Sequence, residues 1–143
     1  MKPDAQRRYT LWAWRLLLLV LLGLVMSLAL APAPQPPQPD WFENADKLRH
    51  ASAFALFWWV GVRALPRAGW LLALGLLAYG LSIELAQALF TTDREASVGD
   101  VLADASGLAL GWALLRWLGQ VRLGALLGQL ASHMKTAGNL SGN

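Results

Sequence analysis

The residues best suited to chemistry lie at three places in the chain, each next to a long apolar segment. They form pairs with helical spacing, i,i+3 or i,i+4: Asp46 with His50, Glu84 with Gln87, and Asp100 with Asp104. In a helix, these spacings put both members of a pair on one face. Carboxylates and a histidine on such faces can exchange protons with a bound molecule, which is general acid–base chemistry.

Basic residues accompany these pairs and are suited to holding an anionic group, such as a lipid phosphate. Lys47 follows Asp46 directly, and Arg94 lies in the polar segment 91–95 that follows Gln87. We therefore assign two kinds of role at one shared site. The residues expected to be catalytic are His50, Glu84 and Asp100, and those expected to bind the substrate are Asp46, Lys47, Gln87, Arg94 and Asp104.

Each of these residues also has a purely structural interpretation. Asp46 and Asp100 suit the first turns of two helices, where a carboxylate stabilises the helix dipole. Arg94 can pair with Glu84, and His50 can be a hydrogen-bonded residue at a membrane interface. A metal site built from His50 and carboxylates is a further alternative, but one histidine provides few ligands for a transition metal. We expect no metal and no cofactor.

The composition explains how these residues are brought together. Apolar residues make up 56% of the 143 residues and charged residues only 15%, whereas a soluble domain carries about 25% charged residues. The bilayer core accepts segments of about 20 mostly apolar residues, and the chain has several of these between its charged stretches. The absence of cysteine excludes disulfides and a thiol nucleophile. The net charge of +3 is expected to set membrane topology, with no nucleic-acid partner.

We predict an all-α polytopic membrane protein with a bundle of four transmembrane helices, at about 11–31, 46–65, 70–90 and 97–118. This membrane domain, 11–118, would lie between a cytoplasmic N-terminus, 1–10, and a cytoplasmic tail, 119–143. The tail pattern allows an amphipathic interfacial helix, followed by disorder. A secretory signal peptide is an alternative for the first segment, but Pro32 directly follows the cleavage-like Ala29-Leu30-Ala31. The segment 32–40 has five prolines and predicts an extended connector.

The basic residues predict the orientation of these four spans. Nine of the 12 lysines and arginines fall on the side of the two termini, and three fall on the opposite side: Lys47, Arg49 and Arg94. Because basic residues are enriched on the cytoplasmic side, both termini are expected in the cytoplasm. The polar pairs would then share the extracytoplasmic side. Gly107 and Gly111 continue the stripe of Asp100 and Asp104, so that this helix face is expected to pack against another helix.

The ordered set of motifs resembles the VanZ-like family of small bacterial membrane proteins. In that family the pattern is Asp-Lys-x-x-His, Glu-x-x-Gln, an arginine in the next loop, and Asp-x-x-x-Asn-x-x-Gly. The resemblance covers about residues 40–118, and the chain carries the corresponding residues Asp46, Lys47, His50, Glu84, Gln87, Arg94, Asp100 and Gly107. It departs at Asp104, where the family usually has asparagine. This adds a second carboxylate beside Asp100.

The resemblance implies a bacterial inner-membrane protein with a role in the cell envelope. The family takes its name from a protein linked to resistance to the glycopeptide teicoplanin. One hypothesis is an enzyme that acts on a lipid-linked or cell-wall intermediate. A second is a non-catalytic module that binds a lipid or a partner protein, and a third is a small ion-coupled transporter, for which four spans are few without oligomerisation. The sequence leaves the substrate and the oligomeric state open.

Overall fold

A computed structural model describes residues 3–32, 45–92 and 96–140, and these residues are helical apart from the connecting turns. The four helices are α1 (Pro3–Ala29), α2 (Ala45–Ala64), α3 (Gly69–Phe90) and α4 (Val98–Leu140). The chain divides into two compact units, Met1–Trp112 and Ala113–Asn143, so that α4 belongs to both. The all-helical fold and the number of helices are as predicted.

Three segments are long and apolar enough to cross a membrane, namely Asp4–Ala29 of α1, α3, and Val98–Leu123 of α4. Helix α2 is not among them, because its 20 residues include charged side chains in the first and last turns. At about 1.5 Å per residue it still extends for about 30 Å, the thickness of a bilayer core. A fourth crossing by α2 stays a prediction, as do the positions of the termini.

The helix ends follow local sequence signals. Pro66 lies in the turn between α2 and α3, where a helix cannot readily continue. The Thr91 amide and hydroxyl both donate to the Gln87 carbonyl, at 3.0 and 2.8 Å, and close the last turn of α3. Ser97 precedes α4, and its hydroxyl accepts from the Asp100 amide at 3.3 Å, as an N-cap residue does.

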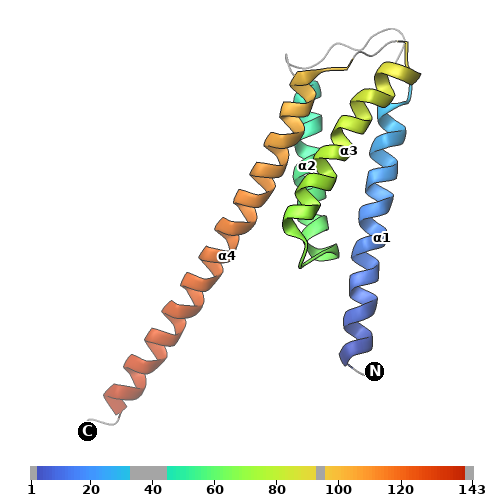
Figure 1. Cartoon of the computed structure of the whole chain (residues 1–143). Helices are drawn as coiled ribbons and strands as arrows, with labels where there is room; N and C mark the ends of the chain where they lie inside the picture. The colour runs from blue at the N-terminus through green and yellow to red at the C-terminus, as the bar shows by residue number, and fades with distance from the viewer. Residues whose placement is uncertain (1–2, 33–44, 93–95, 141–143) are drawn as a thin grey trace. The chain divides into compact units, whose positions relative to one another are not determined.

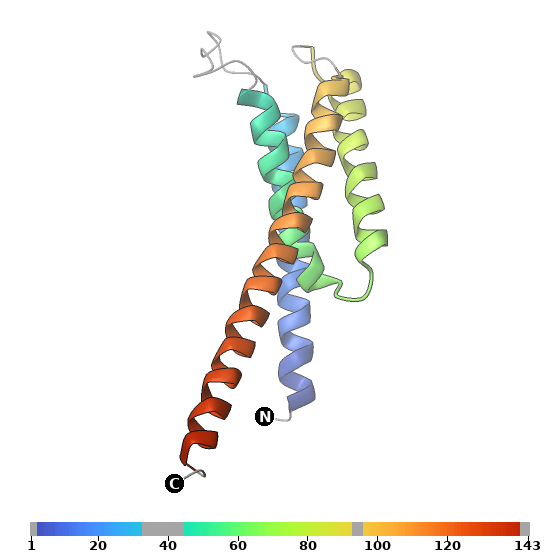
Figure 2. The ribbon, with the colours of Figure 1, turned by 90° about the vertical axis from the view of Figure 1, so that its left-hand side faces the viewer.

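In the first unit, α1, α2 and α3 lie side by side, and the first part of α4 packs against α2 (Figures 1 and 2). The core is rich in large apolar side chains from α2 and α3. Phe54, Phe57 and Tyr79 form a cluster of rings with centroids 5.3 to 6.3 Å apart. Other buried side chains include Val60, Leu72, Leu76 and Ile83.

Small residues let α4 approach α2 closely. A Cβ on Gly107 would collide with the backbone carbonyl of Ala51, and one on Gly111 would lie 3.0 Å from the Ala55 oxygen. The expected packing of this glycine stripe is therefore confirmed. Asp104, one turn before Gly107, is 1% exposed, so that the carboxylate face of α4 points into the helix bundle.

The second unit contains the remaining part of α4. The helix continues through Leu140 and covers the predicted tail helix, together with residues 136–140, for which no helix was predicted. Within it, Trp117, Val121 and Leu123 are exposed. A membrane-surface position for this segment stays a prediction.

Candidate functional site

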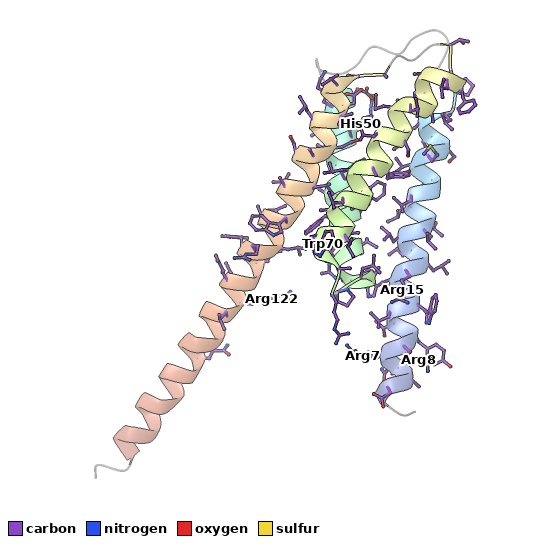
Figure 3. All side chains as sticks on the ribbon, in the orientation of Figure 1. Arg7, Arg8, Arg15, His50, Trp70 and Arg122 are labelled. Carbon is purple, nitrogen blue, oxygen red and sulfur yellow. The ribbon has the colours of Figure 1, made fainter. Side chains whose placement is uncertain are left out.

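All members of the polar pairs except Gln87 meet where three helix ends come together. These are the first turns of α2, the last turns of α3 and the first turns of α4. Figure 3 shows His50 at this end of the first unit, opposite the arginines of α1. Three of the predicted residues here are buried carboxylates, Glu84, Asp100 and Asp104, each less than a tenth exposed. We call this group, together with Asp46 and His50, the polar cluster.

His50 and Asp104 form the central contact of the polar cluster. The His50 Nδ1 and Asp104 Oδ1 atoms are 2.9 Å apart, and the two residues are 54 positions apart in sequence. The imidazole side chain is 15% exposed and the carboxylate 1%. Burying such polar groups is costly unless they are paired, so the hydrogen bond explains how both are tolerated between α2 and α4.

A glycine of α3 makes room for the Asp104 carboxylate. A Cβ on Gly80 would collide with Asp104 Oδ2 and would lie 3.1 Å from Phe54 Cζ. In the described part of the chain, Asp104 Oδ2 is buried without a hydrogen-bond partner. The carboxylate of α4 therefore contacts two other helices, with one oxygen on His50 of α2 and the other against α3.

Glu84 joins α3 to the start of α4. Its Oε2 accepts from the Ser97 amide at 2.7 Å, just before the first turn of α4. Its Oε1 is buried and has no hydrogen-bond partner among the described residues. This contact gives Glu84 a structural role at the site, whatever chemistry it also performs.

Gln87, by contrast, turns away from His50 and contacts α1. Its side-chain amide donates to the Ala29 carbonyl at 3.2 Å, at the end of α1. About two turns earlier in α3, Tyr79 also donates to a carbonyl of α1, that of Leu22, at 2.5 Å. Gln87 thus helps to hold α1 against α3, and the structure does not bring it into the polar cluster.

Asp46 lies at the solvent side of the polar cluster. Its Oδ1 is 3.4 Å from Arg49 Nη1, in an exposed i,i+3 ion pair. One ligand atom from each of Asp46, His50 and Asp100 lies within 4.8 Å of the others, close enough to surround a cation. The residue types suit such a role, and the expectation of no metal stays a prediction.

Of the two basic residues predicted to bind the substrate, the structure describes Lys47. The Lys47 side chain crosses the first turn of α4, with its Cε 2.9 Å from the position that a Cβ on Gly99 would take. An ammonium group is thus placed beside the Asp100 turn. Arg94 lies outside the described residues.

Sequence reasoning missed two residues that shape this site. Ser97 bonds Glu84 and caps α4, and the pattern Ser97-x-x-Asp100 is a recognisable capping signal. Gly80 accommodates Asp104, but a single glycine in an apolar helix carries no signal for such a contact.

Among the residues that the structure describes, the hydrogen bond of His50 uses one of its two ring nitrogens. Asp104 bonds Nδ1 and thereby fixes the orientation of the ring. The other nitrogen, Nε2, can then exchange a proton with a bound molecule, while the carboxylate stabilises the protonated ring.

The comparisons with known proteins are consistent with this pattern of residues. No curated protein and no solved structure matches the chain. A family model described as VanZ/LLP1 matches residues 15–119 and covers all four helices in part or in full. This is more than two thirds of the 143 residues. The chain is therefore a membrane protein that belongs to the VanZ/LLP1 family.

Proposed function

We propose that the polar cluster binds an anionic, lipid-linked component of the bacterial cell envelope and that His50 exchanges a proton with it. The observation that carries this proposal is the buried hydrogen bond of 2.9 Å between His50 and Asp104. A histidine held by a carboxylate on one nitrogen is a recurring arrangement for general bases, because the second nitrogen is oriented toward the substrate.

The surroundings of the hydrogen-bonded pair of His50 and Asp104, which we call the dyad, favour an anionic ligand. The first turn of α4 lies beside it, and helix N-termini attract negative charge. Lys47 lies across this same turn and provides a cation that can hold a phosphate. Because the cluster is at the ends of membrane-length helices, a ligand anchored in the bilayer by its lipid tail would present its head group at this depth.

In the proposed topology both termini are cytoplasmic, α2 crosses the inner membrane, and the polar cluster faces the extracytoplasmic side. The distribution of basic residues supports this orientation. Reporter fusions at residue 93 test it, since a cytoplasmic signal there would contradict the orientation. In this topology Arg94 would join the site from the α3–α4 loop and bind the same anionic group.

A non-catalytic binding module is a second candidate, and the contact of Glu84 favours it. Glu84 is already occupied by the Ser97 amide at 2.7 Å, as expected for a residue that maintains the shape of a binding site. In this alternative His50 and Asp104 position a head group without turnover. A role in teicoplanin resistance belongs to the same proposal and is tested by comparing the susceptibility of cells that express the chain or its His50→Gln variant.

A binding and turnover assay in nanodiscs separates the two candidates. The probe is a polyprenyl pyrophosphate, and the variants are His50→Gln and Asp104→Asn, with Ser106→Ala as the control. Ser106 is exposed, and within the described part of the chain its hydroxyl donates to the Leu102 carbonyl of its own helix. For an enzyme, we expect His50→Gln to lose at least about 100-fold in turnover and to keep binding.

The two other outcomes are also informative. Binding without turnover in the unaltered protein, weakened in both variants, would support the binding module. If neither variant differs from Ser106→Ala in binding or turnover of the probe, the proposed site is wrong.

A further inference from the structure

The end of the first unit opposite the polar cluster is strongly basic. Figure 3 shows Arg7, Arg8 and Arg15 along the part of α1 that lies away from His50. Arg63 in the last turn of α2 and Arg67 in the following turn add two more cations. Among the described residues, Asp4 in the first turn of α1 is the carboxylate at this end. The other described carboxylates belong to the polar cluster.

Arg15 connects α1 to the end of α2. Its Nε donates to the carbonyl of Ala64, the last residue of α2, at 3.3 Å. Carbonyls in the last turn of a helix have no helical donor, so a guanidinium there is stabilising. The same guanidinium lies 5.1 Å from the ring centroid of Trp12, within the range of a cation–π contact.

The guanidinium group of Arg63 contacts two tryptophans, Trp14 of α1 and Trp59 of α2. Its guanidinium carbon is 4.0 Å from the Trp59 ring centroid and 5.5 Å from that of Trp14. The two indoles meet edge to face, with centroids 5.7 Å apart. Arg15 contacts Ala64, the neighbour of Arg63, and Arg63 contacts Trp14, the neighbour of Arg15. The two arginine side chains therefore come from the same contact between α1 and α2.

Both guanidinium groups keep donors for a ligand. Each has five N–H donors, and each gives one hydrogen bond to a backbone carbonyl, Arg15 to Ala64 and Arg63 to Trp59. In the described part of the chain, neither forms an ion pair with a carboxylate. Two like charges at one helix contact repel each other, and an anion that both of them contact removes this repulsion. The planar guanidinium fork is well matched to phosphate oxygens.

The surface next to these arginines suggests a lipid as the source of the phosphate. Along α1, Arg8, Trp12, Leu16 and Leu19 follow one another at helical spacing. Trp12, Leu16 and Leu19 are each more than 60% exposed. This stripe runs from cations through an indole to aliphatic side chains, which is the order of polarity from the head group of a phospholipid to its acyl chains.

We propose that Arg15 and Arg63 together bind the phosphodiester of an anionic glycerophospholipid, whose acyl chain lies along Leu16 and Leu19. The two tryptophans beside Arg63 fix this guanidinium before the lipid binds, so that little side-chain freedom is lost. This site lies at the opposite end of the unit from the polar cluster, and it does not depend on the function proposed there.

Native mass spectrometry of the full chain, released from mixed vesicles of phosphatidylglycerol and phosphatidylcholine, tests the proposal. The test variant is Arg15→Gln/Arg63→Gln. The control is Arg67→Gln/Arg122→Gln, which removes the same charge from two exposed arginines. We expect the unaltered protein and the control to retain phosphatidylglycerol selectively. We expect the test variant to lose about five-fold in retention for each arginine removed, or roughly 25-fold in total.

Three results would overturn the proposal. The first is equal retention of phosphatidylglycerol by the test and control variants. The second is displacement of the lipid by millimolar inorganic phosphate, which would indicate a site for a soluble anion. If circular dichroism shows that the test variant does not fold, Arg15→Lys/Arg63→Lys replaces it, since lysine keeps the charge and loses the planar fork. The third result is unchanged lipid retention in Arg15→Lys/Arg63→Lys, which would mean that charge alone attracts the lipid.

Discussion

Substitution of Gly80 by alanine tests the position of the buried Asp104 carboxylate from a neighbouring helix. The new methyl group would overlap Asp104 Oδ2 and would lie 3.3 Å from Asp104 Cγ and 3.1 Å from Phe54 Cζ. Phe54 is itself 1% exposed and packed against other rings, so it cannot move aside. The carboxylate must therefore shift, and its hydrogen bond to His50 is the contact that it loses.

The magnitude follows from two opposing terms. Losing a buried hydrogen bond and leaving its partners unsatisfied costs about 1–3 kcal/mol. Replacing a helical glycine by alanine returns up to about 1 kcal/mol of helix propensity. We therefore expect a net loss of roughly 1–2 kcal/mol in the free energy of unfolding, together with loss of any activity that depends on the dyad.

Gly75 on the same helix is a matched control. A Cβ on Gly75 would meet no atom within 4 Å, so that Gly75→Ala gains helix propensity without a clash. Thermal unfolding of the two variants in detergent, followed by circular dichroism, should show Gly80→Ala destabilised and Gly75→Ala unchanged or stabilised. If Gly80→Ala is as stable as Gly75→Ala, the carboxylate is not where the structure has it.

Three further substitutions test the contacts around the site. Gly107→Ala should lower the free energy of unfolding by about 1–3 kcal/mol, the cost of overpacking, because its methyl group would collide with the Ala51 carbonyl of α2. An unchanged unfolding midpoint would refute this close approach. Tyr79→Phe removes a hydrogen bond to α1 and should lower stability by about 1 kcal/mol, as measured by unfolding in detergent. Glu84→Ala removes the acceptor of the Ser97 amide, and faster hydrogen exchange at that amide, unchanged in Ser106→Ala, is the expected result.

Helical spacing was enough to predict several features of the site. The stripe of Asp104, Gly107 and Gly111, with i,i+3 and i,i+4 spacing, indicated a face that packs inside the bundle, and the structure confirms both its burial and its close contact with α2. Such features depend on the periodicity of one helix, which can be read from the sequence alone.

The pairing between helices could not be predicted in the same way. That His50 forms its hydrogen bond with Asp104, and not with Glu84 or Asp100, depends on how far α2 and α4 are displaced along each other, and this is set by contacts such as Gly107 with Ala51. Gln87 shares a face with Glu84 by spacing alone, yet its amide reaches α1. Arg15 and Arg63 could be assigned only as part of a basic side, since their contacts with tryptophans and carbonyls depend on the packing of α1 against α2.

The pairing of His50 with Asp104 is the central claim, and solid-state NMR in lipid bilayers tests it most directly. With isotope-labelled histidine and aspartate, the Nδ1 atom of His50 and the side-chain carboxyl carbon of Asp104 should show a through-space correlation, since the two groups are joined by a hydrogen bond of 2.9 Å. The correlation should persist in Gly75→Ala and disappear in Gly80→Ala. Its absence from the folded, unaltered protein would contradict the account.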